Sequence, residues 1–285
     1  MAEATLPIVR TVPDLRAQVR GWKAQGLRIA LVPTMGALHA GHISLIDLAR
    51  RQADRVVASI FVNPTQFGPN EDFERYPRNE ERDAAALAGA GCDLLFAPTV
   101  AEMYAPGFAT TIHVGGVAEP LEGAHRPTHF AGVATVVAKL LIQAEPDIAI
   151  FGEKDYQQLQ VIRRLALDLD IPTAIIGAPI ARAEDGLALS SRNAYLSPSE
   201  REIAAALNRV LNDAAAALHV GEAVAKVEGD GTAALVQAGF DRVDYFAVCD
   251  ADTLAPRGPG PLEGRSRILA AASLGKTRLI DNIAV

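Results

Sequence analysis

The chain has 285 residues, a formal net charge of −7 at pH 7 and 49% hydrophobic residues. Such a chain can bury a large core and divide into two domains. Its acidic balance argues against nucleic acid as a partner. No apolar run reaches membrane-spanning length, and the N-terminus lacks a signal-peptide pattern, so we expect a cytoplasmic protein with no membrane partner. Cys92 and Cys249 lie in separate apolar segments, which favours two buried thiols over a disulfide or metal site.

Strands and helices are predicted to alternate over residues 1–178. Short apolar runs predict strands at 28–32, 56–62, 92–96, 110–114, 147–151 and 173–176. Helical spacing of apolar residues predicts helices at 43–52, 78–90, 131–143 and 157–169. Continuously apolar strands that alternate with helices imply a parallel sheet covered on both faces. We therefore predict an α/β fold, a Rossmann-like doubly wound parallel sheet, for this part.

Residues 179–285 have a different pattern and are predicted to form a smaller α+β lid domain. Ser197-Pro198-Ser199-Glu200 is a capping box with proline at the first helical position, and it predicts a single helix that Gly221 ends. Strands are predicted at 243–249 and 267–272, with a loop rich in proline and glycine at 256–264 that we expect to be mobile.

The most informative motif is His39-Ala40-Gly41-His42, which would arise by chance in about one shuffled chain in a hundred of this composition. It lies between a predicted strand and a predicted helix. Free backbone N–H groups and the helix dipole favour phosphate at such a junction. Imidazoles there can donate hydrogen bonds and stabilise charge that develops during a transfer reaction. The alternative is a pair of solvated loop histidines.

Ligands of parallel sheets bind beyond the carboxyl ends of the strands, which points to the loops 33–42, 63–77 and 152–158. In the second loop, Asn63 and Gln66 each offer a hydrogen-bond donor and an acceptor to a small polar substrate. The alternative is that both are turn residues whose amides face solvent.

Two further segments carry charge. In Gly152-Glu153-Lys154-Asp155, the lysine at a strand end suits a phosphate, and Asp155 suits ribose hydroxyls or the shell of a Mg²⁺ ion. In Ser190-Ser191-Arg192-Asn193, two hydroxyls and a guanidinium suit an oxyanion. Taken singly, the first segment could be an ordinary surface run and the second a polar linker.

The order of these motifs resembles that of the pantoate–β-alanine ligase family, within the nucleotidyltransferase superfamily that carries HIGH motifs. The resemblance extends from about residue 28 to 283. It rests on the motifs above and on four further stretches: Pro33 to Leu38, Glu71 to Arg78, Arg126 to Val137 and Leu274 to Asn282.

The resemblance implies a ligase that forms pantothenate from ATP, (R)-pantoate and β-alanine through a pantoyl adenylate, and that releases pyrophosphate and AMP. It assigns catalysis to His42, His39, Lys154 and Arg192, with His42 as the proton donor. Gln66, Gln158 and Asn63 would hold pantoate and β-alanine. Mg²⁺ would accompany the nucleotide, with no metal held by protein ligands alone. The residues that would line ATP are Met35, Gly36, Ala37, Leu38, His39, Ala40, Gly41, His42, Gly152, Glu153, Lys154, Asp155, Ala181, Leu189, Ser190, Ser191 and Arg192.

The resemblance also implies a homodimer, a second domain that closes over the nucleotide, and a loop near 69–77 that orders on binding. Leu189 replaces the usual methionine, Ala181 replaces a frequent valine, and the stretch 258–264 looks like an insertion. Thr128 replaces a glycine. If the backbone at this position needs a positive φ, the threonine would be strained. Arg126 and His129 are for this reason left out of the candidate site.

Two other functions are considered. A related adenylyl- or cytidylyltransferase would leave the nucleotide on its product, but such chains are commonly shorter and give no reason for the 62–67 motif. A non-catalytic nucleotide-binding protein could keep the fold, but it would be expected to lose a histidine or Lys154.

Overall fold

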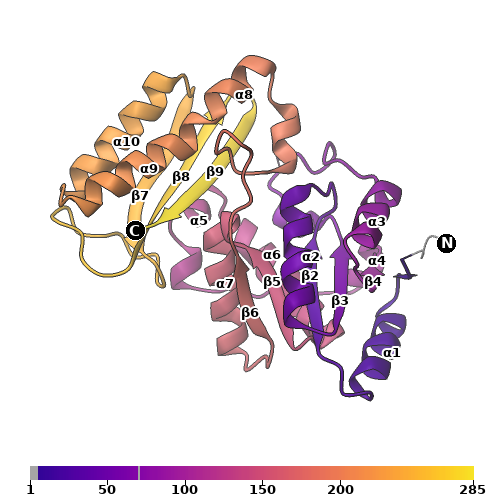
Figure 1. Cartoon of the computed structure of the whole chain (residues 1–285). Coiled ribbons are helices and arrows are strands. Elements are labelled where there is room, and N and C mark those ends of the chain that lie inside the picture. The colour runs from indigo at the N-terminus through magenta and orange to yellow at the C-terminus, as the bar shows by residue number, and fades with distance from the viewer. Residues whose placement is uncertain (1–5, 70) are drawn as a thin grey trace.

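The computed structural model describes residues 6–69 and 71–285 (Figure 1). Its larger sheet has six strands in the order β1-β4-β3-β2-β5-β6, and the paired strands run parallel. These strands are β1 (Ile8–Val9), β2 (Ile29–Thr34), β3 (Arg55–Ile60), β4 (Leu94–Phe96), β5 (Ile148–Gly152) and β6 (Ala174–Ala178). The predicted doubly wound parallel sheet is confirmed.

Helices cover both faces of this sheet because successive strand residues point to opposite sides. On one face, Ile29 and Leu31 of β2 pack in a core with α1 (Val12–Lys23), α6 (His129–Ala144) and α7 (Tyr156–Asp168). On the other face, Ala30 and Val32 pack in a core with α2 (Ala40–Gln52) and α3 (Glu80–Gly89). Strand order reverses between β2 and β5, so the loops after these two strands open onto one crevice.

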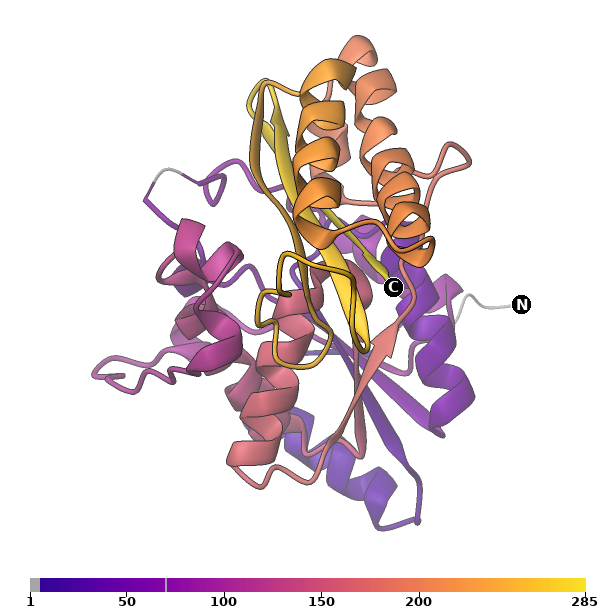
Figure 2. The same ribbon diagram turned by 90° about the vertical axis from the view of Figure 1, so that its left-hand side faces the viewer.

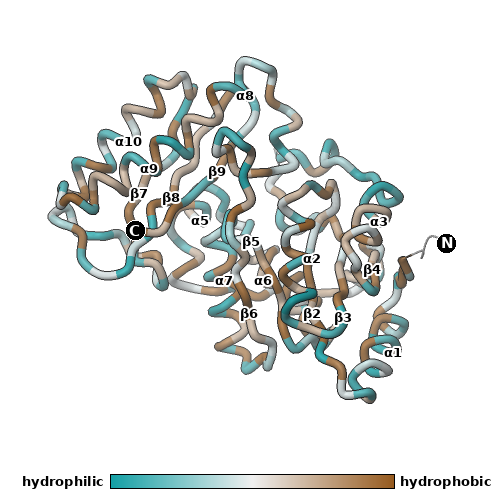
Figure 3. The backbone as a smooth tube through the Cα atoms, viewed as in Figure 1, coloured by the Kyte–Doolittle hydropathy of each residue, from teal (hydrophilic) through white to brown (hydrophobic). Residues whose placement is uncertain are grey.

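The C-terminal part is built on a three-stranded antiparallel sheet of β7 (Arg242–Asp250), β8 (Ser266–Leu274) and β9 (Thr277–Ala284), with β8 in the middle. Two helices, α9 (Ala206–His219) and α10 (Val224–Ala238), pack on one face of it (Figure 2). Hydrophobic stretches concentrate in the strands and the helices that face them, as Figure 3 shows for β7 and β8. The division of the chain into domains 1–178 and 179–285 stays a prediction; β6 ends at Ala178.

Three predicted elements differ from the structure. The segment 110–114 is no strand; the backbone N–H of Ile112 donates instead to Thr135 Oγ1 at 3.0 Å. The single helix expected after Ser197 is two helices, α8 (Pro198–Ala204) and α9, separated at Ala205. The helix expected from Ile43 begins at Ala40, so His42 belongs to its first turn rather than to a loop.

Short elements complete the described chain. They are α4 (Val100–Met103), α5 (Glu122–His125) and the 3₁₀ turns η1 (Pro64–Gln66), η2 (Gly116–Ala118), η3 (Glu153–Asp155) and η4 (Ser191–Tyr195). Within the described residues, no helix is both long and apolar enough to cross a membrane. Cys92 and Cys249 are buried free thiols, as predicted.

Candidate active site

A cavity of about 990 Å³ lies beyond the carboxyl ends of β2 and β5, between the parallel sheet and the C-terminal part. It brings together most of the residues singled out from the sequence. Its walls contain Met35, His39, Gly41, His42, Asn63, Gln66, Gly152, Lys154, Asp155, Gln158, Ala181, Leu189, Ser190, Ser191 and Arg192. Five expected residues are not part of the described walls: Gly36, Ala37, Leu38, Ala40 and Glu153. The motifs after separate strands therefore converge on one site.

The loop before the histidines is held by a buried carboxylate. Asp83 of α3 accepts hydrogen bonds from the backbone N–H groups of Ala37, at 2.8 Å, and Leu38, at 2.9 Å. The chain turns sharply here, with φ of +82° at Gly36 and +52° at Ala37. A left-handed conformation at a non-glycine residue is costly, and the two hydrogen bonds to Asp83 offset that cost. Asp83 thus fixes the approach to His39, and no sequence motif pointed to it.

The two histidines close a reciprocal cap at the start of α2. His39 Nδ1 accepts from the N–H of Gly41 at 3.1 Å, and His42 Nδ1 accepts from the N–H of His39 at 3.4 Å. A ring nitrogen that accepts a hydrogen bond is unprotonated, so these contacts assign the proton of each neutral imidazole to Nε2. Both rings line the cavity, and their centroids are 4.2 Å apart.

Burial and neighbouring positive charge keep both imidazoles neutral. Desolvation, aided by Lys154, lowers the pKa of His39. Desolvation and the proximity of His39 lower the pKa of His42 to about 3. At neutral pH each ring therefore offers one Nε2–H donor without a positive charge. Lys154 and Arg192 are two of the cationic side chains that line the cavity.

Lys154 and Arg192 enter the cavity from opposite parts of the chain. Lys154 lies in η3, directly after β5, and its Nζ is 4.0 Å from Asp155. Arg192 lies in η4, and its Nε and Nη2 donate to Asp72 at 3.1 and 2.9 Å. This contact orients one edge of the guanidinium and leaves Nη1 for another anion. Asp72 is a partner of Arg192 that the sequence did not identify.

The amides of Asn63 and Gln66 follow β3 and line the same cavity. Asn63 is buried and fully bonded: its Nδ2 donates to Gln66 Oε1 and to the carbonyl of Gly132, and its Oδ1 accepts from Tyr104 and Thr65. Among the described residues, the one hydrogen-bond acceptor of Gln66 Nε2 is Met35 Sδ, at 3.0 Å. Because a thioether is a weak acceptor, the Gln66 amide keeps a donor for a ligand. Asn63 therefore positions Gln66.

Arg126 and His129 also line the cavity, next to Gln66. Both donate to the backbone carbonyl of Gln66, at 3.4 and 2.9 Å, and Arg126 forms a two-bond ion pair with Glu71. Thr128 has a φ of −99°, so the replacement of glycine causes no strain at this position. The reason for leaving Arg126 and His129 out of the candidate site was therefore wrong.

The part of the chain that the structure describes offers no ready-made metal site. No group of three or more His, Cys, Asp or Glu side chains within 6–69 and 71–285 is placed to hold a metal ion. The carboxylate nearest to Lys154 in the cavity is that of Asp155, which is about half exposed.

The buried histidine His129 gives a prediction for stability against pH. Burial lowers its pKa to about 4, whereas the unfolded value is near 6.5. Between these values the unfolded chain binds a proton that the folded chain does not, so the free energy of unfolding falls as pH drops from 6.5 towards 4. In His129→Asn, whose amide can still donate to Gln66, this slope should decrease by up to about 1.4 kcal/mol per pH unit. Urea unfolding at several pH values measures it; equal slopes for both proteins would contradict the assignment.

Comparison with known proteins shows the family of the chain. A family model described as pantoate-beta-alanine ligase matches residues 7–284. The pantothenate synthetase of Caulobacter vibrioides is 63% identical over 279 residues, which cover 98% of each chain. That of Rhodospirillum rubrum is 59% identical over 285 residues, covering 98% of this chain and 99% of the relative.

Solved structures of related proteins have the same fold. The pantothenate synthetase of Thermus thermophilus superposes with a TM-score of 0.90 at 48% identity, covering 98% of this chain and 99% of that one. The pantoate-beta-alanine ligase of Francisella tularensis, solved in complex with "Beta-gamma ATP" and β-alanine, has a TM-score of 0.81 at 36% identity, covering 98% and 97%. The chain belongs to the pantoate–β-alanine ligase family, the pantothenate synthetases, and is a ligase that forms an amide bond.

Proposed function

We propose that this chain joins (R)-pantoate to β-alanine at the expense of ATP, through a pantoyl adenylate, and releases pyrophosphate and AMP. One observation carries the proposal. The neutral imidazoles of His39 and His42, the cations Lys154 and Arg192, and the donor amide of Gln66 all face one cavity at the N-terminus of α2. A site of this kind suits a triphosphate on one side and a small polar carboxylate on the other.

ATP is the proposed nucleotide. The Francisella tularensis relative was solved with "Beta-gamma ATP", and the residues argued for phosphate here lie after β2, after β5 and in η4. Backbone N–H groups at the start of α2 add a partial positive charge. Mg²⁺ would be held chiefly by the phosphates, and Asp155 could complete its shell through oxygen, the donor that Mg²⁺ prefers.

In the proposed first step, a carboxylate oxygen of pantoate forms a bond to the α-phosphorus and pyrophosphate leaves. Negative charge develops on the phosphate oxygens. The Nε2–H groups of His39 and His42 would donate hydrogen bonds to them, while Lys154 and Arg192 balance the charge. Because His42 is neutral, it acts as a hydrogen-bond donor and need not give up its proton. Gln66 and Gln158 would hold the pantoate carboxylate and hydroxyls in line.

In the proposed second step, the neutral amine of β-alanine attacks the acyl carbon of the adenylate. The C–N bond forms, the bond from carbon to the phosphate oxygen breaks, and AMP leaves with that oxygen. The amine loses a proton to solvent or to the departing phosphate. The protein contributes position and exclusion of water rather than a covalent intermediate.

Product analysis tests the function against a nucleotidyltransferase. With ATP, Mg²⁺, (R)-pantoate and β-alanine, we expect AMP, pyrophosphate and pantothenate in equal amounts, measured by chromatography. A stable nucleotidyl product that β-alanine does not consume would overturn the proposal, as would binding of ATP without any turnover.

The proposal includes a cytoplasmic location and a homodimer, both from the family resemblance. It also includes closure of the C-terminal part over the nucleotide and ordering of the 69–77 loop on binding. Residue 70 of that loop lies outside the described residues. Two described residues of the loop form ion pairs with the site: Glu71 with Arg126, and Asp72 with Arg192.

A further inference from the structure

The segments that carry Lys154 and Arg192 are both tied to one short stretch of the edge strand β9. Asp281 and Asn282 are adjacent, and each is only 2% exposed. Successive residues of a strand point to opposite faces, so neighbouring side chains can serve two different segments. We call these two residues the β9 pair. They are buried polar residues, and the ligation chemistry described above does not use them.

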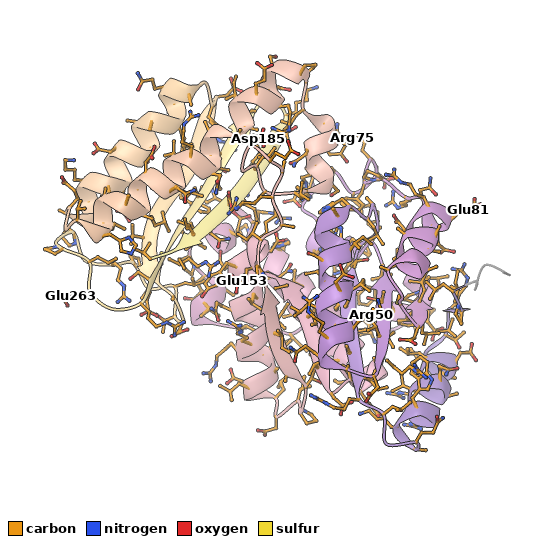
Figure 4. The ribbon with its side chains drawn as sticks, viewed as in Figure 1. Arg50, Arg75, Glu81, Glu153, Asp185 and Glu263 are labelled. Atoms are coloured by element: carbon orange, nitrogen blue, oxygen red, sulfur yellow. The ribbon has the colours of Figure 1, made fainter. Side chains whose placement is uncertain are left out.

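Asn282 holds the segment that carries Lys154. Its Nδ2 donates to the backbone carbonyls of Glu153, at 3.0 Å, and Lys154, at 2.9 Å. Its Oδ1 accepts from Arg267 Nε at 2.6 Å, and Arg267 also donates to the carboxylate of Glu153 at 3.0 Å. The guanidinium of Arg267 lies over the ring of Tyr156, 3.7 Å from its centroid. Glu153 is labelled in Figure 4, between the two sheets. The backbone on both sides of the Lys154 side chain is therefore fixed by β8 and β9.

Asp281 holds the segment that carries Arg192. Its carboxylate pairs with Nη1 and Nη2 of Arg182, at 2.6 and 2.9 Å. Arg182 belongs to a short hairpin in which Ala183 pairs with Leu187 and Leu189 with Ala181, and its Nη1 also donates to the carbonyl of Gly186. This hairpin leads directly into Leu189, Ser190, Ser191 and Arg192. The hairpin that leads into Arg192 is thus anchored, through Arg182, to Asp281.

We infer that the β9 pair positions the two phosphate-binding cations relative to each other. Asn282 acts through Lys154, and Asp281 acts through Arg182 on the Ser190–Arg192 segment. A rigid support matters here because a displacement of about 1 Å in a catalytic group can cost about a hundredfold in rate. The antiparallel sheet then both closes the nucleotide site and positions its residues. The inference rests on the proposed roles of Lys154 and Arg192.

The test is a crossed set of double variants, with ATP·Mg²⁺ affinity measured by calorimetry in the absence of pantoate. Asn282→Asp replaces a donor by an acceptor that faces two carbonyls, and Asp281→Asn removes the charge that pairs with Arg182. Each should weaken ATP binding by about tenfold and lower the rate of pyrophosphate release, while KM for pantoate changes less than about threefold.

The crossed backgrounds assign each effect to its cation. The effect of Asn282→Asp should nearly vanish in Lys154→Ala and persist in Arg192→Ala, and the effect of Asp281→Asn should do the reverse. Effects that multiply in both backgrounds would show general destabilisation and overturn the inference. If Lys154→Ala and Arg192→Ala alone leave ATP binding unchanged, the proposed function of these cations fails, and the inference fails with it.

Two sets of control variants separate a positioning effect from a loss of folding. Asp250→Asn removes the charge at the end of β7 that pairs with Arg257, at 2.9 Å and away from the cavity, and should leave ATP binding unchanged. If a β9 variant does not fold, Arg182→Lys and Arg267→Lys leave β9 intact. The first disrupts the two-bond pair with Asp281, and the second disrupts the contacts of Arg267 with Asn282 Oδ1 and Glu153. Wild-type ATP affinity in both lysine variants would overturn the inference.

Discussion

His42→Ala should slow pyrophosphate release from ATP and pantoate by about 10²–10³-fold, which is typical of the loss of one well-placed donor to a developing oxyanion. The variant should still fold. Among the described residues, the one hydrogen bond it loses is the 3.4 Å contact from the N–H of His39, and a helix cap of this kind contributes about 1 kcal/mol or less. Rapid-quench measurement of the first turnover gives the rate, and circular dichroism gives the fold.

Two further variants separate catalysis from capping. Ser44→Ala removes another contact of the first turn of α2, the 2.8 Å hydrogen bond to the carbonyl of Gly41, and Ser44 does not line the cavity. It should keep wild-type activity. His42→Gln retains an amide N–H near the place of Nε2 and should recover part of the rate. Full activity in a folded His42→Ala protein would disprove the assignment of this residue.

Gly132→Ala should disrupt the amide side of the site and destabilise the fold. A Cβ at this position would lie 2.3 Å from the backbone oxygen of Thr65 and 2.7 Å from Cα of Gln66. Both are backbone atoms, so α6 and η1 must move apart, and the hydrogen bond from Asn63 to the carbonyl of Gly132 is strained. We expect a loss of about 1–3 kcal/mol in the free energy of unfolding and a rise in KM for pantoate larger than that for ATP.

Gly229→Ala is the matched control for this variant. Gly229 also lies inside a helix, α10, but nothing would lie within 4 Å of its Cβ. Alanine should therefore stabilise the protein there by about 0.5–1 kcal/mol. Equal stability changes in the two variants, or an unchanged KM for pantoate in Gly132→Ala, would contradict the close approach of α6 to η1.

The strands of the parallel sheet could be predicted because their burial on both faces makes them continuously apolar. The strand predicted at 110–114 was wrong because a segment of strand-like composition forms no strand without a neighbouring strand to pair with. The backbone N–H of Ile112 donates to Thr135 instead. β9 was missed because Asp281 and Asn282 interrupt its apolar pattern. These residues are buried only because Arg182 and the 153–154 backbone pair with them.

Helix α10 was missed for a related reason. It contains Gly229 and Gly231, which weaken a helical pattern. A Cβ at Gly231 would lie 2.4 Å from the ring of Phe246, so this glycine lets the helix pack closely on β7. Such a tertiary requirement leaves no local signal in the sequence.

The site residues that could be predicted from the sequence are those that directly follow a strand and have side chains with a recognisable chemical role. The supporting contacts could not, because their partners lie far apart in the chain: Asp83 under the histidine loop and Asp72 beside Arg192 are examples. The lowered pKa of His42 could not be predicted either, because it depends on burial and on the proximity of His39 and Lys154 in the folded chain.

The most direct test of the two-step account is pyrophosphate release without β-alanine. With enzyme, ATP, Mg²⁺ and D-pantoate, we expect a burst of pyrophosphate close to one per site, no burst with L-pantoate, and AMP with pantothenate only after β-alanine is added. Release of pyrophosphate that requires β-alanine from the outset would contradict an adenylate formed in a separate first step.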